Sequence, residues 1–417
     1  MKSKIILAIE TSCDETAMSV VEFGQSKNCW DFEVLSNVVA SQIDLHKKWG
    51  GVYPELASRA HLEAMVPVLG EALEPLTTSS KFQTLNSNEI INSKSQKNII
   101  RDSSFIIKNF VDAAAVTAGP GLVGSLLMGI ETAQILGAYY HKSIIPVNHL
   151  EGHIYSAFCA VSEKLPVSAD GQAEVGKVKS ENDNLKFEIP KSGIFPILAL
   201  VVSGGHTSLI LMKDHLKYET VGQTIDDAAG EAFDKVARIL GLGYPGGPAI
   251  EKFAVGGNEN AYKLPIARLE NKLNFSFSGL KTAVLYLTKD PATGNIRKYN
   301  KKDLAASFQK TACQTLIEKT ILAIEKYNPK TVILSGGVSA NSYLREHFVK
   351  QLSAIPPTPR LRRVGSRQQS VKILIPPKNL STDNAVGIGI AGAIKAFRCN
   401  PKLDISVQPN WKIDELQ

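Results

Sequence analysis

The stretch Ile197-Leu198-Ala199-Leu200-Val201-Val202-Ser203-Gly204-Gly205-His206-Thr207 is an apolar run that passes directly into a turn of small residues. A short continuous apolar run next to glycines is typical of a buried strand. Glycines at a strand's end let backbone N–H groups approach a phosphate, because no Cβ stands in the way. The stretch therefore predicts a strand that ends in a phosphate-binding turn, with an ordinary tight connection as the alternative.

Two other segments repeat this pattern. Residues 5–12 form an apolar run that ends in Thr11-Ser12, and residues 331–341 contain Ser335-Gly336-Gly337-Val338-Ser339. The run at residues 5–12 is followed by a strand-like segment at residues 17–21. The run at residues 197–207 is followed by one at residues 208–212. A further glycine-containing turn, Thr117-Ala118-Gly119-Pro120-Gly121-Leu122, precedes a helical pattern. Together these turns indicate a nucleotide cleft between two related lobes.

The remaining periodicity indicates an α/β protein. Apolar runs predict buried strands at residues 5–9, 113–117, 144–147, 197–202, 209–212 and 331–334. Helical patterns lie between them at residues 122–140, 227–240 and 303–326. A chain of 417 residues is long for a single core and suggests two domains. We place them at residues 1–150 and 151–417, with a C-terminal helix that returns to the first lobe.

Composition limits the classes of protein that this chain can belong to. Hydrophobic residues make up 44% and charged residues 21%, and no apolar run approaches the roughly 18 residues needed to span a bilayer. The first apolar run is too short for a signal peptide. The five cysteines are scattered without paired spacing, which favours a reducing cytoplasm. A net charge of +7 permits a polyanionic partner without requiring one.

Three polar segments read as surface insertions, at residues 77–108, 162–192 and 355–374. The third lies within residues 347–382, which contain no Asp or Glu. This acid-free stretch predicts a contact with a nucleic-acid phosphate backbone, with a solvated loop as the alternative. Its basic residues are Lys350, Arg360, Arg362, Arg363, Arg367, Lys372 and Lys378.

The segment Asn148-His149-Leu150-Glu151-Gly152-His153 contains two histidines four residues apart. On a helix they share one face and can bind one metal ion. Two unrelated histidines at a helix start are the alternative. A zinc protease motif needs glutamate directly after the first histidine, where this chain has Leu150. Glu151 lies roughly 200° around the helix from His149, so it cannot easily act as a base on the same metal.

Four further residues are candidates for a site. Asp383 precedes an apolar, glycine-rich helix, so it is either an N-cap or a third metal ligand beside the two histidines. Asp227 and Asp234 are seven residues apart in a predicted helix and should share a face, with Asp234 the better candidate for a ligand contact. Asn341 follows a Gly-Gly turn, where it caps a helix or contacts a nucleoside.

These motifs resemble, in order along nearly the whole chain, those of the tRNA N6-adenosine threonylcarbamoyltransferase family, formerly described as O-sialoglycoprotein endopeptidases. The resemblance rests on Ile9 to Thr16, Pro54 to Arg59, Thr117 to Leu122, Asn148 to His153, Val202 to Thr207, Asp226 to Lys235, Tyr244 to Pro248, Phe275 to Thr282, Gly336 to Asn341 and Thr382 to Asn384.

The resemblance implies the two-lobed fold of actin, sugar kinases and heat-shock ATPases, with a nucleotide cleft. It implies transfer of a threonylcarbamoyl group from threonylcarbamoyl-AMP to N6 of the adenosine 3′ to the anticodon, in tRNAs that read codons beginning with A. The metal ligands implied are His149, His153 and Asp383. The implied contacts to the substrate nucleotide are Val201, Val202, Ser203, Gly204, Gly205, Asp234, Gly247, Glu251 and Asn341.

The resemblance also implies a cofactor and partners. One divalent metal ion is expected per subunit, iron(II) first and zinc(II) as the alternative. A bacterial member would act with a shorter paralogue of the same fold and a P-loop ATPase, and no membrane is expected. A sugar kinase or ATPase of this fold and a non-catalytic scaffold are the alternative functions. The imidazole ligands argue against the kinase, because Mg-ATP enzymes seldom use them, and the complete ligand set argues against the scaffold.

Overall fold

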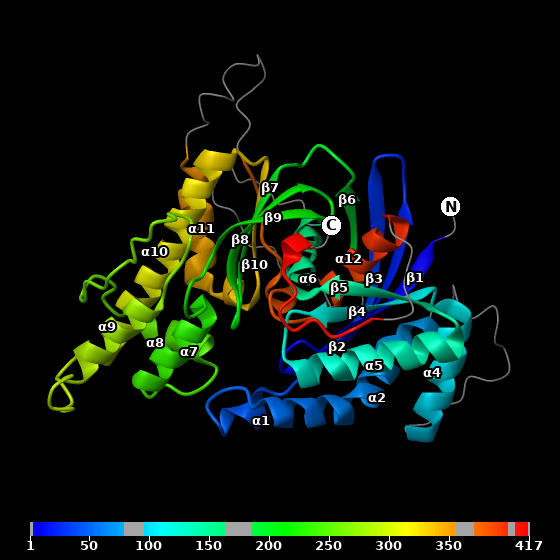
Figure 1. Ribbon diagram of the computed structural model, residues 1–417, viewed down its shortest axis with the longest axis horizontal. Coiled ribbons are helices and arrows are strands. Elements are labelled where there is room, and N and C mark those ends of the chain that lie inside the picture. The colour runs from blue at the N-terminus through cyan, green and yellow to red at the C-terminus, as the bar shows by residue number, and fades with distance from the viewer. Residues whose placement is uncertain (1–2, 79–95, 163–184, 356–370, 399–404, 416–417) are drawn as a thin grey trace, which may run out of the picture. The chain divides into compact units, whose positions relative to one another are not determined.

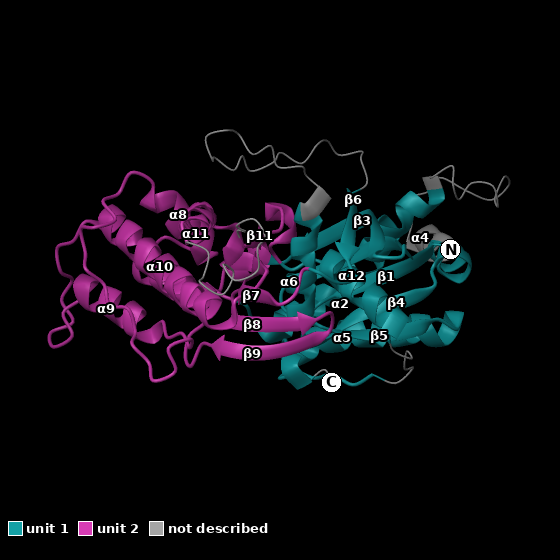
Figure 2. Cartoon of the chain, turned by 90° about the horizontal axis from the view of Figure 1, so that it is seen from above, with its two compact units in different colours: residues 1–42, 52–193, 383–415 teal, residues 43–51, 194–382, 416–417 magenta. Residues whose placement is uncertain are grey.

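The structure is a computed structural model that describes residues 3–78, 96–162, 185–355, 371–398 and 405–415. The chain divides into two compact units (Figure 2). The first comprises residues 1–42, 52–193 and 383–415, and the second comprises residues 43–51, 194–382 and 416–417. Arg360, Arg362, Arg363 and Arg367, on which the predicted phosphate contact depends, lie outside the described residues.

The first unit is built on a six-stranded mixed sheet with the order β5-β4-β1-β2-β3-β6. β1, β4 and β5 are parallel, and β2, β3 and β6 pair antiparallel with their neighbours. The carboxyl ends of the three parallel strands therefore meet at one edge of the sheet. The strands are β1 (Lys4–Glu10), β2 (Glu15–Gln25), β3 (Cys29–Ser41), β4 (Ala113–Gly119), β5 (Ser143–Asn148) and β6 (Leu185–Pro190).

Helices cover both faces of this sheet (Figure 1). On one face, α2 (Pro54–Thr78) packs on β2 and β3, and α5 (Val123–Tyr140) packs on β4, with α4 (Gln96–Phe110) beside α2. On the other face, α12 (Ala385–Arg398) crosses the sheet and packs against α6 (His149–Ser156). Two short 3₁₀ helices, Ala157–Ser162 and Ile413–Glu415, complete the unit.

Glycines in α12 allow this helix to lie very close to its neighbours. A Cβ on Gly389 would meet Val21 and Ala8 of the sheet, and a Cβ on Gly392 would meet Ala115. Towards α6, a Cβ on Gly387 would overlap a backbone carbonyl of that helix. The missing side chains therefore set the distance at which α12 packs on the sheet and on α6.

The second unit has a five-stranded sheet with the order β11-β10-β7-β8-β9. β7, β10 and β11 are parallel, whereas β8 and β9 continue the sheet as antiparallel strands. All residues of β7 and β10 are buried, as their continuous apolar runs predicted. The strands are β7 (Ile197–Val202), β8 (Thr207–Asp214), β9 (Lys217–Gln223), β10 (Thr331–Ser335) and β11 (Lys372–Leu374).

The helices of the second unit pack around a continuous apolar core. The long helix α10 supplies buried side chains along much of its length, and Phe308 packs edge-on against Phe233 of α7. The helices are α1 (Ile43–Lys47), α7 (Ala229–Ile239), α8 (Gly246–Ala254), α9 (Ser278–Thr288), α10 (Lys301–Tyr327) and α11 (Ser342–Ser353), with 3₁₀ turns at Gly337–Ala340 and Lys378–Leu380.

Apart from β6, both sheets have the same topology, as the internal repeat predicted. In each, the first strand pairs antiparallel with the second, and the second pairs antiparallel with the third. On its other side the first strand pairs parallel with a later strand, which in turn pairs parallel with a further strand. β1 therefore corresponds to β7. The glycine-containing stretch at residues 331–341 begins with β10. By its place in the sheet, β10 corresponds to β4 and not to β1. The predicted two-lobed α/β fold is confirmed in its essentials.

The expected boundary at residue 150 differs from the observed division at residues 193 and 194. The helix α6 packs on α12, and β6 extends the first sheet, so both belong to the first unit. The helix α12 lies in the first unit. The segment 77–108 is not a loop throughout, since α2 includes Thr78 and α4 begins at Gln96.

Cys13, Cys29, Cys159 and Cys313 are free thiols, and two of them are buried. In the described ranges, no helix combines the length and the apolar character that a membrane crossing requires.

We predict that Gly387→Ala destabilises the first unit, because the added methyl would overlap Gly152 O and Ser156 Oγ. Such overpacking costs roughly 1–3 kcal/mol. The measurement is the free energy of unfolding in urea. Gly24→Ala is the matched control, since a methyl there meets no other atom within 4 Å. Equal stability of the two variants would contradict the close packing of α6 and α12.

Candidate functional site

The helix α6 begins where β5 ends, and its start is fixed by side-chain hydrogen bonds. Asn148 Oδ1 accepts from Leu150 N at 3.0 Å, and Glu151 Oε2 accepts from Asn148 N at 3.0 Å. This reciprocal capping box satisfies backbone donors that the first helical turn would otherwise leave unpaired. It also fixes the direction in which the first residue of the helix, His149, leaves the sheet.

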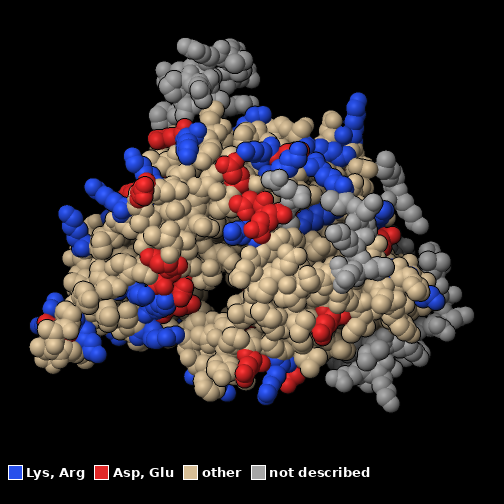
Figure 3. Space-filling view, in the orientation of Figure 1, with Lys and Arg blue, Asp and Glu red and all other residues tan. Residues whose placement is uncertain are grey.

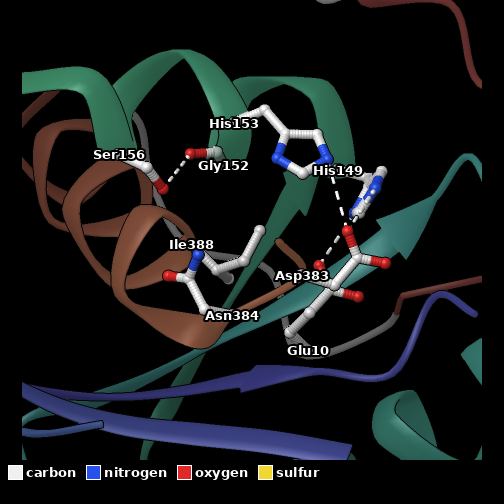
Figure 4. Close-up of a pocket in the computed structure, with 8 residues that line it drawn as sticks. All are labelled: Glu10, His149, Gly152, His153, Ser156, Asp383, Asn384 and Ile388. Carbon is white, nitrogen blue, oxygen red and sulfur yellow. Dashed lines mark hydrogen bonds and ion pairs between the residues drawn. The ribbon is translucent and has the colours of Figure 1, made fainter. Parts of the chain in front are cut away.

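His149, His153 and Asp383 come together at one point in the first unit (Figure 4). Their ligand atoms all lie within 4.8 Å of one another. Asp383 Oδ1 is 3.6 Å from His149 Nε2 and 3.3 Å from His153 Nε2. The two imidazole rings are buried and Asp383 is largely so. The structure thus brings together the three residues that the sequence suggested as metal ligands.

These distances and the donor set fit a metal ion. Ligand atoms about 2.0 Å from a tetrahedral metal are separated by about 3.3 Å, close to the two distances to Asp383 Oδ1. His153 Nε2 is a buried nitrogen that lies 3.3 Å from Asp383 Oδ1 but makes no hydrogen bond of acceptable geometry with the described residues. A buried polar atom in that state is costly unless a ligand satisfies it. Two imidazoles and one carboxylate suit zinc and iron and leave coordination positions for a substrate.

Glu10 was not singled out by the sequence analysis, although it lies in direct contact with His149. It ends β1, is 1% exposed, and places Oε2 3.0 Å from His149 Nδ1. Burial favours the neutral acid, but His149 and Thr117 outweigh it and hold the pKa of Glu10 below its ordinary value. A glutamate that directly follows five apolar strand residues was the signal in the sequence.

The same carboxylates control the protonation of His149. Burial would lower the pKa of the imidazole, but Glu10 and then Asp383 raise it to about 9. Without a metal, the ring is therefore protonated at neutral pH, and a metal ion must displace that proton in order to bind.

Glu151 points away from the metal ligands, as its position on the helix predicted. It is fully buried, and its Oε2 pairs with Lys395 Nζ of α12 at 2.6 Å. The ammonium group also donates to Pro146 O at 3.1 Å and lies 5.5 Å from the centre of the Trp411 ring. This pair joins α6 to α12, so its role is to hold the metal-site helices together.

In the second unit, the predicted phosphate-binding turn follows β7. Ser203 N donates to His206 O at 2.8 Å, and Ser203 Oγ accepts from His206 N at 3.1 Å, which closes a tight turn. Gly204 and Gly205 are exposed, and a Cβ on either would meet no atom within 4 Å. Val201 and Val202 are buried strand residues, so only their backbone could contact a ligand.

Contacts connect the other predicted nucleotide residues to this turn. Gly230 N of α7 donates to Ser203 O at 3.2 Å. Asp234 Oδ1 of α7 accepts from Gly246 N at 2.7 Å, which fixes the start of α8. Glu251 Oε1 of α8 accepts from Ser342 N at 2.9 Å, at the start of α11. The candidates therefore form one connected group at the carboxyl ends of β7 and β10.

Asn341 caps α11, which is one of the two roles that the sequence predicted for it, the other being a nucleoside contact. Its Oδ1 accepts from Leu344 N at 2.9 Å, and its Nδ2 donates to Gln309 Oε1 at 3.0 Å. Gly247, by contrast, leaves open space, since a Cβ there meets nothing within 4 Å. In this group the glycines offer accessible backbone, whereas Asp234, Glu251 and Asn341 hold that backbone in place.

The predicted shared helix face of Asp227 and Asp234 was wrong. The helix α7 begins at Ala229, so Asp227 lies outside it. Asp227 pairs with Lys235 Nζ and Lys281 Nζ, each at 2.7 Å. Thr207 Oγ1 accepts from Ala229 N at 2.9 Å and so caps the helix in place of an aspartate. The hydrophobic period could not reveal this cap, which comes from another strand.

Comparison with known proteins identifies the family to which the chain is similar. A family model described as tRNA N6-adenosine threonylcarbamoyltransferase matches residues 33–83, 98–174 and 182–390. A protein of that name from Clostridium botulinum (strain Kyoto / Type A2) is 40% identical to this chain over the full length of both. One from Symbiobacterium thermophilum is 42% identical over 93% of this chain and 90% of the relative. One from Synechococcus sp. (strain JA-3-3Ab) is 41% identical over 99% of this chain and 93% of the relative. Full-length HypF, a solved structure, matches 95% of this chain with 46% of its own, at a TM-score of 0.46 and 12% identity.

We predict that zinc raises the melting temperature of the protein and that His149→Ala abolishes the effect. A ligand at 100 times its Kd stabilises the native state by about 2.7 kcal/mol. Because the His149 pKa is raised to about 9, the ring binds a proton below that pH. The zinc-induced rise should therefore shrink as the pH falls below about 9. Thermal unfolding with and without zinc is the measurement.

The control for this experiment is His141→Asn, which changes an exposed histidine at the end of α5. Asparagine tolerates the left-handed backbone at this position, where φ is 55°. This variant should respond to zinc as the parent does. A full zinc response in His149→Ala would remove His149 from the metal site.

Proposed function

This chain belongs to the tRNA N6-adenosine threonylcarbamoyltransferase family and is a transferase, and we propose that it transfers the threonylcarbamoyl group from threonylcarbamoyl-AMP to N6 of the adenosine 3′ to the anticodon. The tRNAs concerned are those that read codons beginning with A, and AMP is the leaving group. The observation that supports this proposal most directly is the convergence of His149, His153 and Asp383 on one point.

The reaction needs an electrophile to be activated. Adenine N6 attacks the carbamoyl carbonyl carbon, the bond from that carbon to the AMP phosphate oxygen breaks, and N6 loses a proton. His149, His153 and Asp383 would hold a divalent metal ion, which would supply a Lewis acid to offset the negative charge that develops on the carbonyl oxygen. Iron(II) is our first choice and zinc(II) the second. The buried walls at Gly152 and Ile388 limit water around the ligands.

The nucleotide part of the donor is assigned to the second unit. Backbone N–H groups at Gly204 and Gly205 are suited to a phosphate, because the glycines have no side chain that would block it. Ser203 N donates to His206 O, so Ser203 shapes the turn. Gly247 at the start of α8 offers a second open stretch of backbone. The protein needs no phosphoryl chemistry, because AMP is already bound to the acyl group in the donor.

A sugar kinase or ATPase of the same fold is the second candidate. The ligand set decides against it, since magnesium prefers oxygen ligands and water over imidazole. A scaffold without catalysis would not need a buried His153 Nε2 held without a hydrogen-bond partner beside Asp383.

An exposed apolar stripe on α5 supports a protein partner. Val123, Leu127, Ile135 and Tyr139 follow one another at intervals of four and eight residues and are 58%, 37%, 67% and 73% exposed. Figure 3 shows this side of the first unit as a largely uncharged area. Apolar surface of this kind marks interaction sites. We assign it to the shorter paralogue of the same fold that the family resemblance implies, with a P-loop ATPase as the third component.

The enzyme test combines purified protein, its implied partners, unmodified tRNA and threonylcarbamoyl-AMP. We expect formation of N6-threonylcarbamoyladenosine, detected by nucleoside mass spectrometry, together with AMP. Gly205→Val should raise the KM for the donor roughly tenfold or more, equivalent to about 1.4 kcal/mol, because its branched side chain would occupy the phosphate position. Gly24→Val, in a strand of the first unit, is the control. An unchanged KM in Gly205→Val would exclude this turn from the site.

The partner prediction concerns Leu127→Glu combined with Ile135→Glu. Charges within the stripe should weaken binding of the shorter paralogue at least about tenfold, because burying an unpaired charge is costly. Calorimetry with the paralogue measures the Kd. Val255→Glu, at an equally exposed apolar position of the second unit, should leave it unchanged. An unchanged Kd in the double variant would place the partner elsewhere.

A further inference from the structure

A buried carboxylate lies directly behind one of the proposed metal ligands. Glu10 Oε2 is 3.0 Å from His149 Nδ1, while His149 Nε2 faces Asp383 on the other side of the ring. We propose that Glu10 is a positioning residue that keeps the proton of His149 on Nδ1, so that the Nε2 lone pair is directed at the metal. This inference rests on the metal site proposed above.

The sheet brings the residues of this network together. β1 is parallel to β4, and β4 is parallel to β5, with Ile9 opposite Val116 and Thr117 opposite Val147. Glu10 ends β1, Thr117 lies two residues before the end of the neighbouring strand β4, and His149 follows β5, so all three lie near the same edge. The pairing register, rather than a flexible loop, sets the distance between the carboxylate and the imidazole.

Three donors converge on Glu10. Oε1 accepts from Ser12 N at 2.6 Å, and Oε2 accepts from Thr117 Oγ1 at 2.7 Å as well as from His149 Nδ1. All these groups are buried. A carboxylate is an acceptor only, so it matches three donors without conflict. Such charge-assisted bonds fix the position of Glu10 against the ring.

Because of the Ser12 hydroxyl, the proton of His149 has two possible positions, Nδ1 and Nε2. Ser12 Oγ also lies 3.0 Å from His149 Nδ1 and could donate to it. That arrangement would put the proton on Nε2 and take the lone pair away from the metal. It would also place the Nδ1 lone pair against the carboxylate of Glu10, which is unfavourable. With Glu10 ionised, the Nδ1–H form is favoured, as in other histidine ligands that donate to a carboxylate.

Glutamine at position 10 tests this reasoning because it has nearly the same shape. Its amide can keep one oxygen acceptor, but its NH₂ group must face either Ser12 N–H or the imidazole. If it faces the imidazole, it donates to Nδ1 and favours the Nε2–H form. Loss of such a supporting carboxylate typically weakens metal binding roughly 10–100-fold.

The experiment measures zinc affinity of the full-length protein by competition with a chelator, for the parent, Glu10→Gln and Glu22→Gln. Glu22 is a buried glutamate of β2 in the same sheet and serves as the control for loss of charge. We expect roughly 10–100-fold weaker zinc binding for Glu10→Gln only. In ¹⁵N-histidine spectra of the metal-free proteins, recorded where His149 is neutral, the parent should show Nδ1–H and Glu10→Gln should show Nε2–H.

Thr117→Val is the second variant, in case Glu10→Gln does not fold. It removes one hydrogen bond to Oε2 without contacting the imidazole, and we expect a smaller loss of zinc affinity with the Nδ1–H form retained. Parental zinc affinity and an unchanged proton position in Glu10→Gln would overturn the positioning role. If the parent itself bound no zinc, the metal site would fail instead, so the two failures are distinguishable.

Discussion

The close contact of α6 and α12 is the constraint on which the metal site depends. Gly152 and Gly387 let the two helix backbones approach, and a methyl on Gly387 would overlap Gly152 O. His149 and His153 lie on the first helix, and Asp383 lies just before the second, so this contact closes the ligand set. A shift of about 1 Å between the helices would change every ligand distance, and sites of this kind tolerate errors of only about 0.5 Å.

Two buried glutamates near this contact have different roles because their partners differ. Glu151 pairs with Lys395, whose charge compensates it and joins the helices, so it is unsuited to proton transfer at the metal. Among the described residues, Glu10 pairs with no lysine or arginine and instead accepts from neutral donors and from His149. Its negative charge therefore acts on the imidazole, which is consistent with the raised pKa of His149.

The sequence predicted the strands well and brought His149 and His153 onto one helix face, because both features depend on short patterns. Buried parallel strands are continuous apolar runs, and the i, i+4 spacing alone places His149 and His153 on one helix face. It failed where long-range contacts decide. Thr207 caps α7, which begins at Ala229, so Asp227 lies outside the helix that the sequence predicted. Glu10 is functional only through the register of β1, β4 and β5, which no local pattern contains.

The two sheets show how one topology can support two kinds of chemistry. In the first unit, side chains near the carboxyl ends of β1, β4 and β5 form hydrogen bonds with one another. Glu10 accepts from Thr117 and from His149. At the corresponding ends of β7 and β10, Gly205 and Gly337 leave the backbone open. Side chains at strand ends suit a metal, whereas bare backbone suits a phosphate. The repeated fold therefore places both candidate sites at strand ends, and the residues there differ in the kind of ligand to which they are suited.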